Sequence, residues 1–172
     1  MYHFQYVSKN EIASLKNQVI ELIGLVQDEI RNYFTFQYKF IGSVKLNMVT
    51  CDVKSNIGFD FDVNIMFNDD DEEYSAKDIK QILMKAFNKY AYKYHYDFCE
   101  DRTRVFTIKV KDRKNSRILH SCDFAIVNNY SDNLQEYIRF NKKSNSYDWT
   151  EQSDGFTFCQ KKYNFAKIIL YG

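Results

Sequence analysis

The stretch from residue 59 to residue 67 constrains the fold more than any other part of the sequence. Apolar and polar side chains alternate there in the order Phe59, Asp60, Phe61, Asp62, Val63, Asn64, Ile65, Met66 and Phe67. Successive side chains of a β-strand point to opposite faces, so the pattern predicts a strand with one apolar face and one face bearing two carboxylates. Like charges that close repel each other, and Mg²⁺ is typically held by one or two carboxylates together with substrate phosphates. The pair therefore predicts a metal site for phosphate chemistry.

The composition is that of a globular protein with almost no net charge. The 172 residues are 45% hydrophobic and 27% charged, with a formal net charge of +1, so charge does not indicate a nucleic-acid partner or a membrane. The cysteines stand apart from one another and from histidines at zinc-finger spacing, and we expect free thiols at Cys51, Cys99, Cys122 and Cys159. Without a signal peptide or an apolar run of membrane-spanning length, the predicted location is the cytoplasm.

Two segments have the apolar periodicity of helices. A capping box at Ser8 and Glu11 opens the first, which we expect to end near Tyr33. Its apolar stripe consists of Ile12, Leu15, Val19, Leu22, Ile23, Val26 and Ile30. Ser75 caps the second, with Asp78 three positions later. Its stripe consists of Ile79, Ile82, Leu83, Ala86, Phe87 and Tyr90.

Further strands are predicted on both sides of the second helix. Residues 36–41 form a short strand that Gly42-Ser43 ends, and residues 44–57 are a short helix or loop. Residues 102–111 alternate, residues 112–116 form a hairpin turn, and residues 117–127 return with Asp123 on the polar face. Further along, we predict a solvated acidic loop at 68–73, a helix at 134–140, short strands or packed loop at 147–149 and 156–158, and a last helix or strand at 163–170.

Three features now stand in a fixed order: Ile41-Gly42-Ser43 at a strand end, Asp60-Phe61-Asp62-Val63 on the next strand, and Asp123 on a later one. In this order the sequence resembles the nucleotidyltransferase superfamily that contains polymerase beta. Within it, the sequence looks most like the bacterial relatives of cyclic GMP-AMP synthase and oligoadenylate synthase. The resemblance covers about residues 8–130.

The resemblance implies an α+β fold, with a mixed, mostly antiparallel sheet flanked by helices. It also implies transfer of a nucleoside monophosphate from a nucleoside triphosphate, with ATP as the expected donor, to a hydroxyl acceptor. Mg²⁺ or Mn²⁺ would be the cofactor, the products would be linear or cyclic oligonucleotides, and the role would be antiviral defence. Asp60, Asp62 and Asp123 would be both catalytic residues and metal ligands. Gly42, Ser43 and Lys45 would bind the nucleotide.

The chain departs from the family pattern in two ways. The spacer between Ser43 and Asp60 holds 16 residues, more than in compact members. The family's C-terminal helical domain has no counterpart, so we expect one nucleotidyltransferase core domain over residues 1–172. Two alternatives stay open: a catalytically silent module that binds a nucleotide or partner, and transfer to a protein, a tRNA end or a small molecule. The intact set of three acids favours an enzyme.

Some residues have two readings. The basic hairpin of Lys109, Lys111, Arg113, Lys114 and Arg117 is either a solvated turn or a surface that steers a triphosphate or nucleic acid. Tyr147 and Trp149 either stack on a base or pack in the core. His120 shares the face of Cys122, opposite Asp123, which predicts a packed histidine rather than a ligand.

Overall fold

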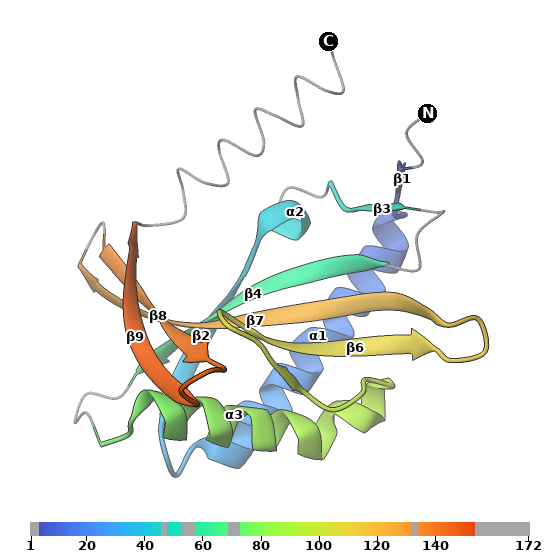
Figure 1. Cartoon of the computed structure of the whole chain (residues 1–172). Helices are drawn as coiled ribbons and strands as arrows, with labels where there is room; N and C mark the ends of the chain where they lie inside the picture. Colours follow the sequence, from blue (N-terminus) through green and yellow to red (C-terminus); the bar gives the residue numbers. More distant parts are fainter. Residues whose placement is uncertain (1–3, 46–47, 53–57, 69–72, 132–133, 154–172) are drawn as a thin grey trace.

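The computed structural model describes residues 4–45, 48–52, 58–68, 73–131 and 134–153. Figure 1 shows a curved sheet with the helix α3 (Ala76–Tyr90) below it, the helix α1 (Lys9–Ile30) running behind it, and a small pair of strands above one end. The elements predicted at 156–158 and 163–170, Cys159 and most of the acidic loop lie outside the described residues.

The main sheet has the strand order β2-β4-β7-β6-β5, and β8 and β9 extend it. Its strands are β2 (Thr35–Ile41), β4 (Phe59–Asn68), β5 (Glu100–Asp101), β6 (Phe106–Asp112), β7 (Arg117–Ser131), β8 (Leu134–Asn141) and β9 (Ser146–Ser153). Among the described strands of this sheet, β4 pairs with β7 in parallel, and the other pairs are antiparallel. The predicted α+β fold with a mixed, mostly antiparallel sheet is therefore confirmed.

The β8–β9 hairpin takes the edge of β7 that β6 leaves vacant. Val127 pairs with Met66 of β4 on one side and with Tyr137 of β8 on the other. Because β6 pairs with β7 only as far as Phe124, β8 can continue the sheet from that point. In Figure 1 the closed end of the hairpin comes down beside α3, where Lys80 lies near the rings of Phe140 and Tyr147.

Both long helices begin where the sequence predicts. In α1 (Lys9–Ile30) the hydroxyl of Ser8 accepts a hydrogen bond from the amide of Glu11, and the predicted stripe is buried except for the partly exposed Leu15. In α3 (Ala76–Tyr90) Ser75 and Asp78 form a reciprocal capping box, which satisfies two amides that the first turn leaves without partners. The helix α1 ends at Ile30, earlier than predicted, and a turn follows in which Tyr33 and Phe34 donate to the Ile30 carbonyl.

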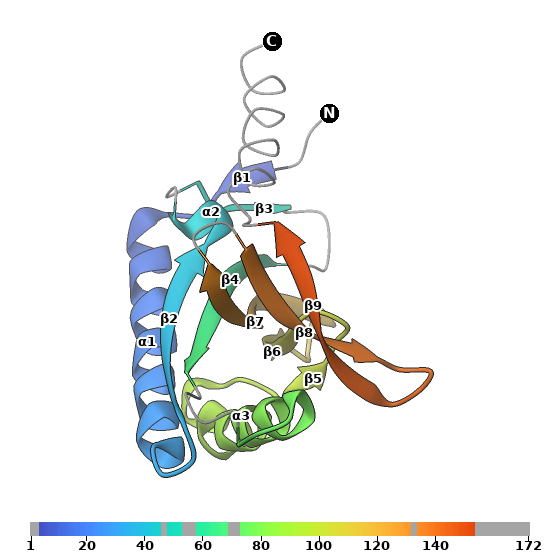
Figure 2. The ribbon, with the colours of Figure 1, turned by 90° about the vertical axis from the view of Figure 1, so that its left-hand side faces the viewer.

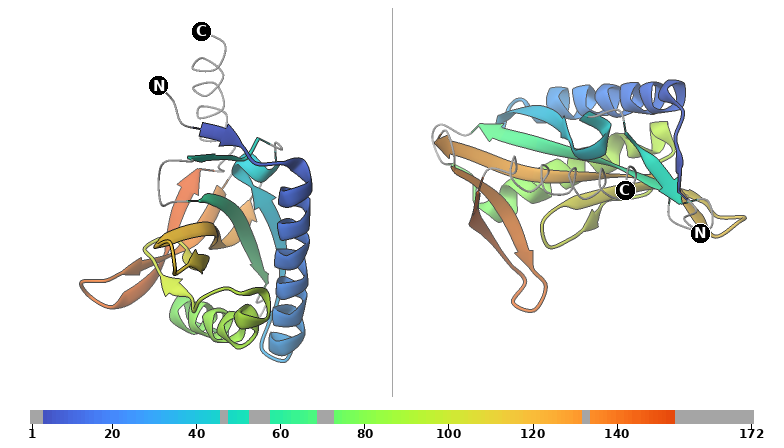
Figure 3. Two further views of the ribbon diagram at one scale, coloured as in Figure 1. Left: turned by 90° about the vertical axis from the view of Figure 1, so that its right-hand side faces the viewer. Right: turned by 90° about the horizontal axis from the view of Figure 1, so that it is seen from above.

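Both helices cover one face of the sheet, and the core lies between them (Figures 2 and 3). Phe61, Phe106 and Phe124 stand on that face with no more than 1% exposure, and Phe87 of α3 packs 4.5 Å from Phe124 and 5.1 Å from Phe106 between ring centroids. Fully burying each such ring contributes roughly 1.5–3 kcal/mol. The predicted alternation of residues 59–67 thus gives β4 its buried face. None of the helices in the described part of the chain is long and apolar enough to cross a bilayer.

Smaller elements surround this frame. After β2 comes one turn of helix, α2 (Gly42–Lys45), and β1 (Phe4–Tyr6) pairs with β3 (Thr50–Asp52) in a two-stranded sheet of its own. A 3₁₀ turn, η1 (Ala91–Tyr94), follows α3. The short helix agrees with the expectation for residues 44–57, whereas β1 and β3 were not predicted because three residues are too few to show a period.

Two predictions about elements were wrong. Residues 134–140 form the strand β8 and not a helix: Tyr137 and Ile138 are both buried, so both faces of the strand are covered and the sequence shows no alternation. Residues 102–111 are not one strand, because a turn in which the Arg102 amide donates to the Val105 carbonyl separates β5 from β6. The turn at 112–116 and the strand nature of 147–149 are confirmed.

Candidate active site

The register of the parallel strand pair brings two of the predicted acids to the same level. Asp62 on β4 lies opposite Asp123 on β7, and Asp60 lies opposite Ser121. Neighbouring strands are about 4.8 Å apart, so the backbones of Asp62 and Asp123 are that close. All three acids lie on the sheet face that the long helices do not cover, since Phe61 and Phe124 beside them point into the core.

Gly42 closes one side of this acidic group. A Cβ atom built on Gly42 would lie 2.6 Å from Oδ2 of Asp62, and the residue has a φ of +66°. Both the close approach and the positive φ require glycine. The turn that ends β2 therefore places backbone directly against the Asp62 carboxylate, on the side away from Asp123.

Hydroxyl groups on neighbouring strands hold the other two acids. Ser121 donates to Oδ1 of Asp60, and Thr107 of β6 donates to Oδ1 of Asp123 over 2.5 Å. Both hydroxyl-bearing residues are buried. Because each carboxylate has a second oxygen, these bonds orient Asp60 and Asp123 without using all of their acceptor capacity.

The acids differ in exposure, and burial affects the proton affinity of one of them. Asp60 is exposed, whereas Asp62 and Asp123 are half-buried. Burial raises the pKa of Asp123; the hydrogen bond from Thr107 opposes this shift, and the charge of Asp60 adds to it. Burial, followed by the charges of the three carboxylates, raises the pKa of Cys122 on the opposite face, so its thiol stays neutral.

The donor atoms suit a hard divalent cation. Mg²⁺ and Mn²⁺ prefer carboxylate oxygens, and ligating carboxylates are commonly oriented by hydrogen bonds of the kind that Ser121 and Thr107 donate. Among the described residues, no three acidic, histidine or cysteine side chains converge closely enough to form a ready-made metal centre. The donor chemistry of the three carboxylates fits such an ion.

The other predicted nucleotide contacts lie next to the acids along the chain. Ser43 is half-buried in α2, and its carbonyl accepts a hydrogen bond from the Met48 amide over 3.0 Å. Lys45, at the end of α2, is exposed, and within the described residues no ion pair is assigned to it. The backbone of Gly42 therefore contacts the carboxylate of Asp62, whereas Lys45 lies one helical turn further along the chain.

His120, Tyr147 and Trp149, for which the sequence allowed either a functional or a packing role, make packing contacts in the structure. His120 is 7% exposed, stacks on Phe59 and bonds the Tyr96 hydroxyl at 3.1 Å, and burial lowers its pKa to about 4. The prediction of a packed histidine is therefore confirmed. Tyr147 stacks on Phe140 and donates to Asp101, and Trp149 packs against Phe67. These contacts favour the packing role for both aromatic residues.

Comparison with solved structures identifies the fold. The chain superposes on the CD-NTase CdnG of Bradyrhizobium diazoefficiens, solved with GTP, with a TM-score of 0.65 and 11% identity, over 92% of this chain and 43% of that one. This chain has the nucleotidyltransferase fold. The cyclic AMP-GMP synthase DncV of Vibrio cholerae, a prokaryotic cGAS homolog, matches with a TM-score of 0.57 and 10% identity, over 78% of this chain and 51% of that one. The structure of Vibrio cholerae DncV bound to 3'-deoxy ATP matches with a TM-score of 0.55 and 16% identity, over 95% of this chain and 42% of that one.

The match confirms the resemblance to bacterial CD-NTases at the level of the fold. No protein-family model matches the chain, and no curated protein is similar to it in sequence. The nucleotidyltransferase fold found here spans about two-fifths to one-half of the length of the neighbours. Activity, substrates and partners are consequently matters for proposal.

Sequence reasoning missed the two hydroxyl groups that hold the acids. Alternation places Thr107 with Lys109 and Ser121 with Asp123 on polar faces, but it gives the face of a residue and not its neighbour on the next strand. The pairing of polar faces across the predicted hairpin could have found Thr107, which lies opposite Asp123. The contact of Ser121 with Asp60 depends on the register of β4 with β7, which the hairpin does not give.

Proposed function

We propose that the protein is a metal-dependent nucleotidyltransferase that moves a nucleoside monophosphate from a nucleoside triphosphate, with ATP as the expected donor, to a hydroxyl group. One observation carries the proposal. Asp62 and Asp123 lie side by side on parallel strands, Asp60 shares their face, and the Gly42 backbone closes against Asp62. Neighbours in the fold that were solved with GTP or an ATP analogue support a triphosphate as substrate.

Each residue has a chemical task in this reaction. Asp60 and Asp62 would hold the divalent ions, Mg²⁺ or Mn²⁺, and Asp123 would complete the set. Bound there, the ions would neutralise phosphate charge and lower the pKa of the attacking hydroxyl. Gly42, Ser43 and Lys45 would bind the outgoing phosphates, because backbone without a Cβ, an amide and an ammonium group all suit oxyanions.

The bonds exchanged are those of an in-line substitution. The acceptor oxygen forms a bond to the α-phosphorus, and the bond between that phosphorus and its bridging oxygen to the β-phosphate breaks. Pyrophosphate leaves with the electron pair, and the hydroxyl proton passes to Asp123, whose Oδ1 accepts from Thr107 and whose other carboxylate oxygen can take a proton. A nucleotide as acceptor would give linear or cyclic oligonucleotides.

The experiment is incubation with each labelled nucleoside triphosphate and Mg²⁺ or Mn²⁺, followed by separation of the products and measurement of pyrophosphate. Asp60→Asn and Asp62→Asn should each reduce the rate by more than roughly a hundredfold, since even groups that only support a metal ligand contribute 10–100-fold. Asp28→Asn removes an exposed carboxylate of α1 and should leave the rate unchanged. Pyrophosphate release that survives both site substitutions would contradict the assignment.

The second candidate is a catalytically silent binding module with the same fold. The observation that favours it is the lack, among the described residues, of three metal-binding side chains already gathered around one point. A protein that binds a triphosphate tightly but releases no pyrophosphate, with any donor and either metal, would support this candidate over the enzyme.

A further inference from the structure

The strand β7 contains one extra residue just before the part that carries its acid. On β6, Lys111 pairs with Ile118 of β7. Its neighbour Val110 pairs with His120, so Leu119 is left without a partner on β6 and forms a β-bulge. Pairing of β7 with β4 begins at the next residue of β7. The bulge therefore stands at the point where β7 joins the strand that carries the other two acids.

The bulge decides which side chains of β7 share a face with the polar side chains of β6. If the register next to the turn at 112–116 continued along both strands, Thr107 would lie opposite Cys122, whose side chain points into the core. With the extra residue, Thr107 lies opposite Asp123 and donates a hydrogen bond to its carboxylate. A slip of one residue turns every side chain of a strand to the other face. The candidate site therefore depends on a bulge that stays in place.

Gly58 accommodates the bulge from the β4 side. A Cβ atom built on Gly58 would lie 1.8 Å from the carbonyl oxygen of Leu119 and 2.4 Å from its carbonyl carbon. Both are backbone atoms, so no side-chain movement could make room for a larger residue. Only glycine lets the bulged backbone approach the start of β4 this closely.

A buried hydrogen bond holds the bulge from the core side. The hydroxyl of Tyr96 bonds Nε2 of His120, the residue after the bulge, at 3.1 Å, and the two residues are 4% and 7% exposed. The His120 ring also stacks on Phe59 of β4, with 5.7 Å between ring centroids. A polar group buried without a partner costs free energy, so this bond fixes both side chains in surroundings that are otherwise mostly apolar.

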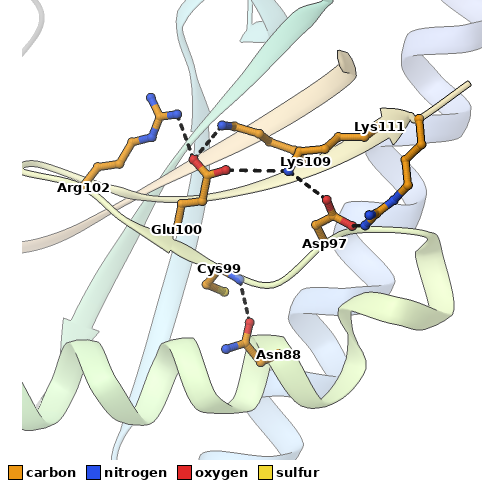
Figure 4. Close-up of polar contacts among 8 residues, drawn as sticks. Asn88, Asp97, Cys99, Glu100, Arg102, Lys109 and Lys111 are labelled. Atoms are coloured by element: carbon orange, nitrogen blue, oxygen red, sulfur yellow. Dashed lines mark hydrogen bonds and ion pairs between the residues drawn. The ribbon is translucent and has the colours of Figure 1, made fainter. Parts of the chain in front are cut away.

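The segment that carries Tyr96 is itself anchored on two sides. The amide of the next residue, Asp97, donates to the Lys109 carbonyl of β6 over 2.8 Å. Figure 4 shows the Cys99 amide donating to the side chain of Asn88 on α3, over 2.7 Å. Tyr96 thus meets His120 from a backbone that is tied to both β6 and α3.

The buried bond lies one residue away from a contact of the candidate site. Ser121 follows His120, and its hydroxyl donates to Oδ1 of Asp60. Adjacent residues of a strand point to opposite faces, so fixing the His120 ring on the core face also fixes the Ser121 hydroxyl on the acidic face. Asp60 is exposed, unlike the half-buried Asp62 and Asp123. Its orientation therefore depends most on such a hydrogen bond.

We propose that Tyr96 and His120 are positioning residues for the candidate metal site. Together with the bulge, they set the Ser121 hydroxyl against Asp60, and that bond orients the carboxylate toward a divalent cation. This inference rests on the proposed metal-dependent function. Tyr96 and His120 act through the backbone of β7 and contact neither the ion nor the substrate. Hydrogen-bond partners that orient metal ligands typically change metal affinity by roughly 10–100-fold.

The test measures the affinity of the protein for Mn²⁺ alone, from the electron paramagnetic resonance signal of the free ion. Tyr96→Phe keeps the ring but removes the hydroxyl, and it should raise the Kd of Mn²⁺ severalfold. Ser121→Ala should raise the Kd roughly tenfold or more, and Ser121→Thr, which keeps a hydroxyl, should restore most of the affinity. Tyr94→Phe is the matched control: Tyr94 donates to the exposed Glu21, so this variant should bind Mn²⁺ as wild type does.

A double variant separates positioning from a merely structural role. Because Tyr96 acts through Ser121, adding Tyr96→Phe to Ser121→Ala should leave the Kd of Ser121→Ala unchanged. An equal loss of affinity in both backgrounds would overturn the proposal. A Tyr96→Phe variant that is less stable in urea but binds Mn²⁺ as tightly as wild type would overturn it too, as would wild type that binds no Mn²⁺.

The reaction rate distinguishes failure of this inference from failure of the proposed function. In Tyr96→Phe, the Mn²⁺ concentration at half-maximal rate should rise by the same factor as the Kd, with the KM of the triphosphate unchanged. The expected pattern of Kd values without pyrophosphate release by wild type would support the positioning residues and reject the enzymatic function. Pyrophosphate release with equal Mn²⁺ affinities in wild type, Tyr96→Phe and Ser121→Ala would reject the positioning role and keep the function.

Discussion

Gly42 lies against Asp62 so closely that a Cβ atom at position 42 would be 2.6 Å from the Oδ2 atom of that carboxylate. This contact joins the turn after β2 to the acidic face of β4. It also explains why glycine is needed at a position that the sequence alone marks only as a strand end. In the structure, the φ of +66° at Gly42 independently disfavours every other residue type except, to a lesser degree, asparagine and aspartate.

Replacing Gly42 by alanine should destabilise the fold around the acids. An L-residue in the left-handed region costs about 1–2 kcal/mol, and the new methyl group would push the Asp62 carboxylate aside. We expect the free energy of unfolding, measured with urea, to fall by about 2 kcal/mol. Gly24→Ala is the matched control: Gly24 lies in α1 with no atom within 4 Å of the added Cβ, so this change should stabilise by up to ~1 kcal/mol. Equal effects of the two substitutions would contradict the close contact.

Divalent cations should stabilise the protein through the three acids. A ligand that binds only the native state adds ~2.7 kcal/mol to the free energy of unfolding at about 100 times its Kd. We expect Mg²⁺ or Mn²⁺ to raise the Tm of wild type over EDTA, and Asp62→Asn to lose most of this gain. Asp28→Asn, in which the removed carboxylate is exposed on α1, should keep it. A similar gain in both variants would indicate a general salt effect, and the site would then hold no ion.

The buried lysine of α3 should be critical for stability. Lys80 is 1% exposed; its ammonium group contacts Asp101 at 2.7 Å and the Arg102 carbonyl at 2.9 Å, and it lies 5.8 Å from the ring centroids of both Phe140 and Tyr147. Burial lowers the pKa of Lys80, and the hydrogen bond and charge of Asp101 oppose that shift.

Lys80→Met should leave the half-buried Asp101 without its cation and cost about 3–5 kcal/mol in urea unfolding. The control is Lys89→Met on the same helix, where the partner Glu29 is one-third exposed and the lysine more than half. Because solvent screens that exposed pair, its removal should change the stability far less. Comparable losses in both variants would show that the Lys80 contacts do not hold β5 and β9 to α3.

His120 should make stability depend on pH in the mildly acidic range. Burial lowers its pKa from 6.5 to about 4, so as the pH falls below 6.5 the unfolded chain takes up a proton that the native state resists. The contribution is therefore complete above pH 6.5 and is lost progressively toward pH 4, by roughly 2 kcal/mol at pH 5. The groups around the ring are Tyr96, Phe59 and Phe61, none of them charged near pH 7.

The measurement is urea unfolding at pH 7.5 and pH 5 for wild type, His120→Gln and His95→Asn. His120→Gln should have a smaller loss between the two pH values than wild type, whatever its stability at pH 7.5. His95 is exposed with a φ of 65°, a conformation that asparagine tolerates, so His95→Asn should lose as much as wild type. A loss in His120→Gln as large as that of wild type would mean that the imidazole does not titrate differently in the two states.

The sequence allowed the main elements to be predicted where one local signal was strong. The side-chain caps at Ser8 and Ser75 mark the starts of α1 and α3, and alternation gives β4 and most of β7 with the correct buried faces. Residues 134–140 failed because the spacing of Leu134, Tyr137 and Ile138 is also that of a helix. These residues form a strand because they pair with β7 and β9. Such pairing depends on residues far away in the sequence, so a local sequence pattern cannot reveal it.

The sequence by itself determined which residues are polar, on which face of which strand they stand, and, through the order Gly42-Ser43, Asp60-x-Asp62 and Asp123, which superfamily the chain resembles. Only the tertiary structure decided that Asp62 faces Asp123, that Thr107 and Ser121 hold two of the acids, and that Lys109 shares Glu100 with Arg102. The physical reason is that side-chain alternation is a property of one strand. Register is a property of two strands, and it is fixed by the packing of the whole sheet on α1 and α3.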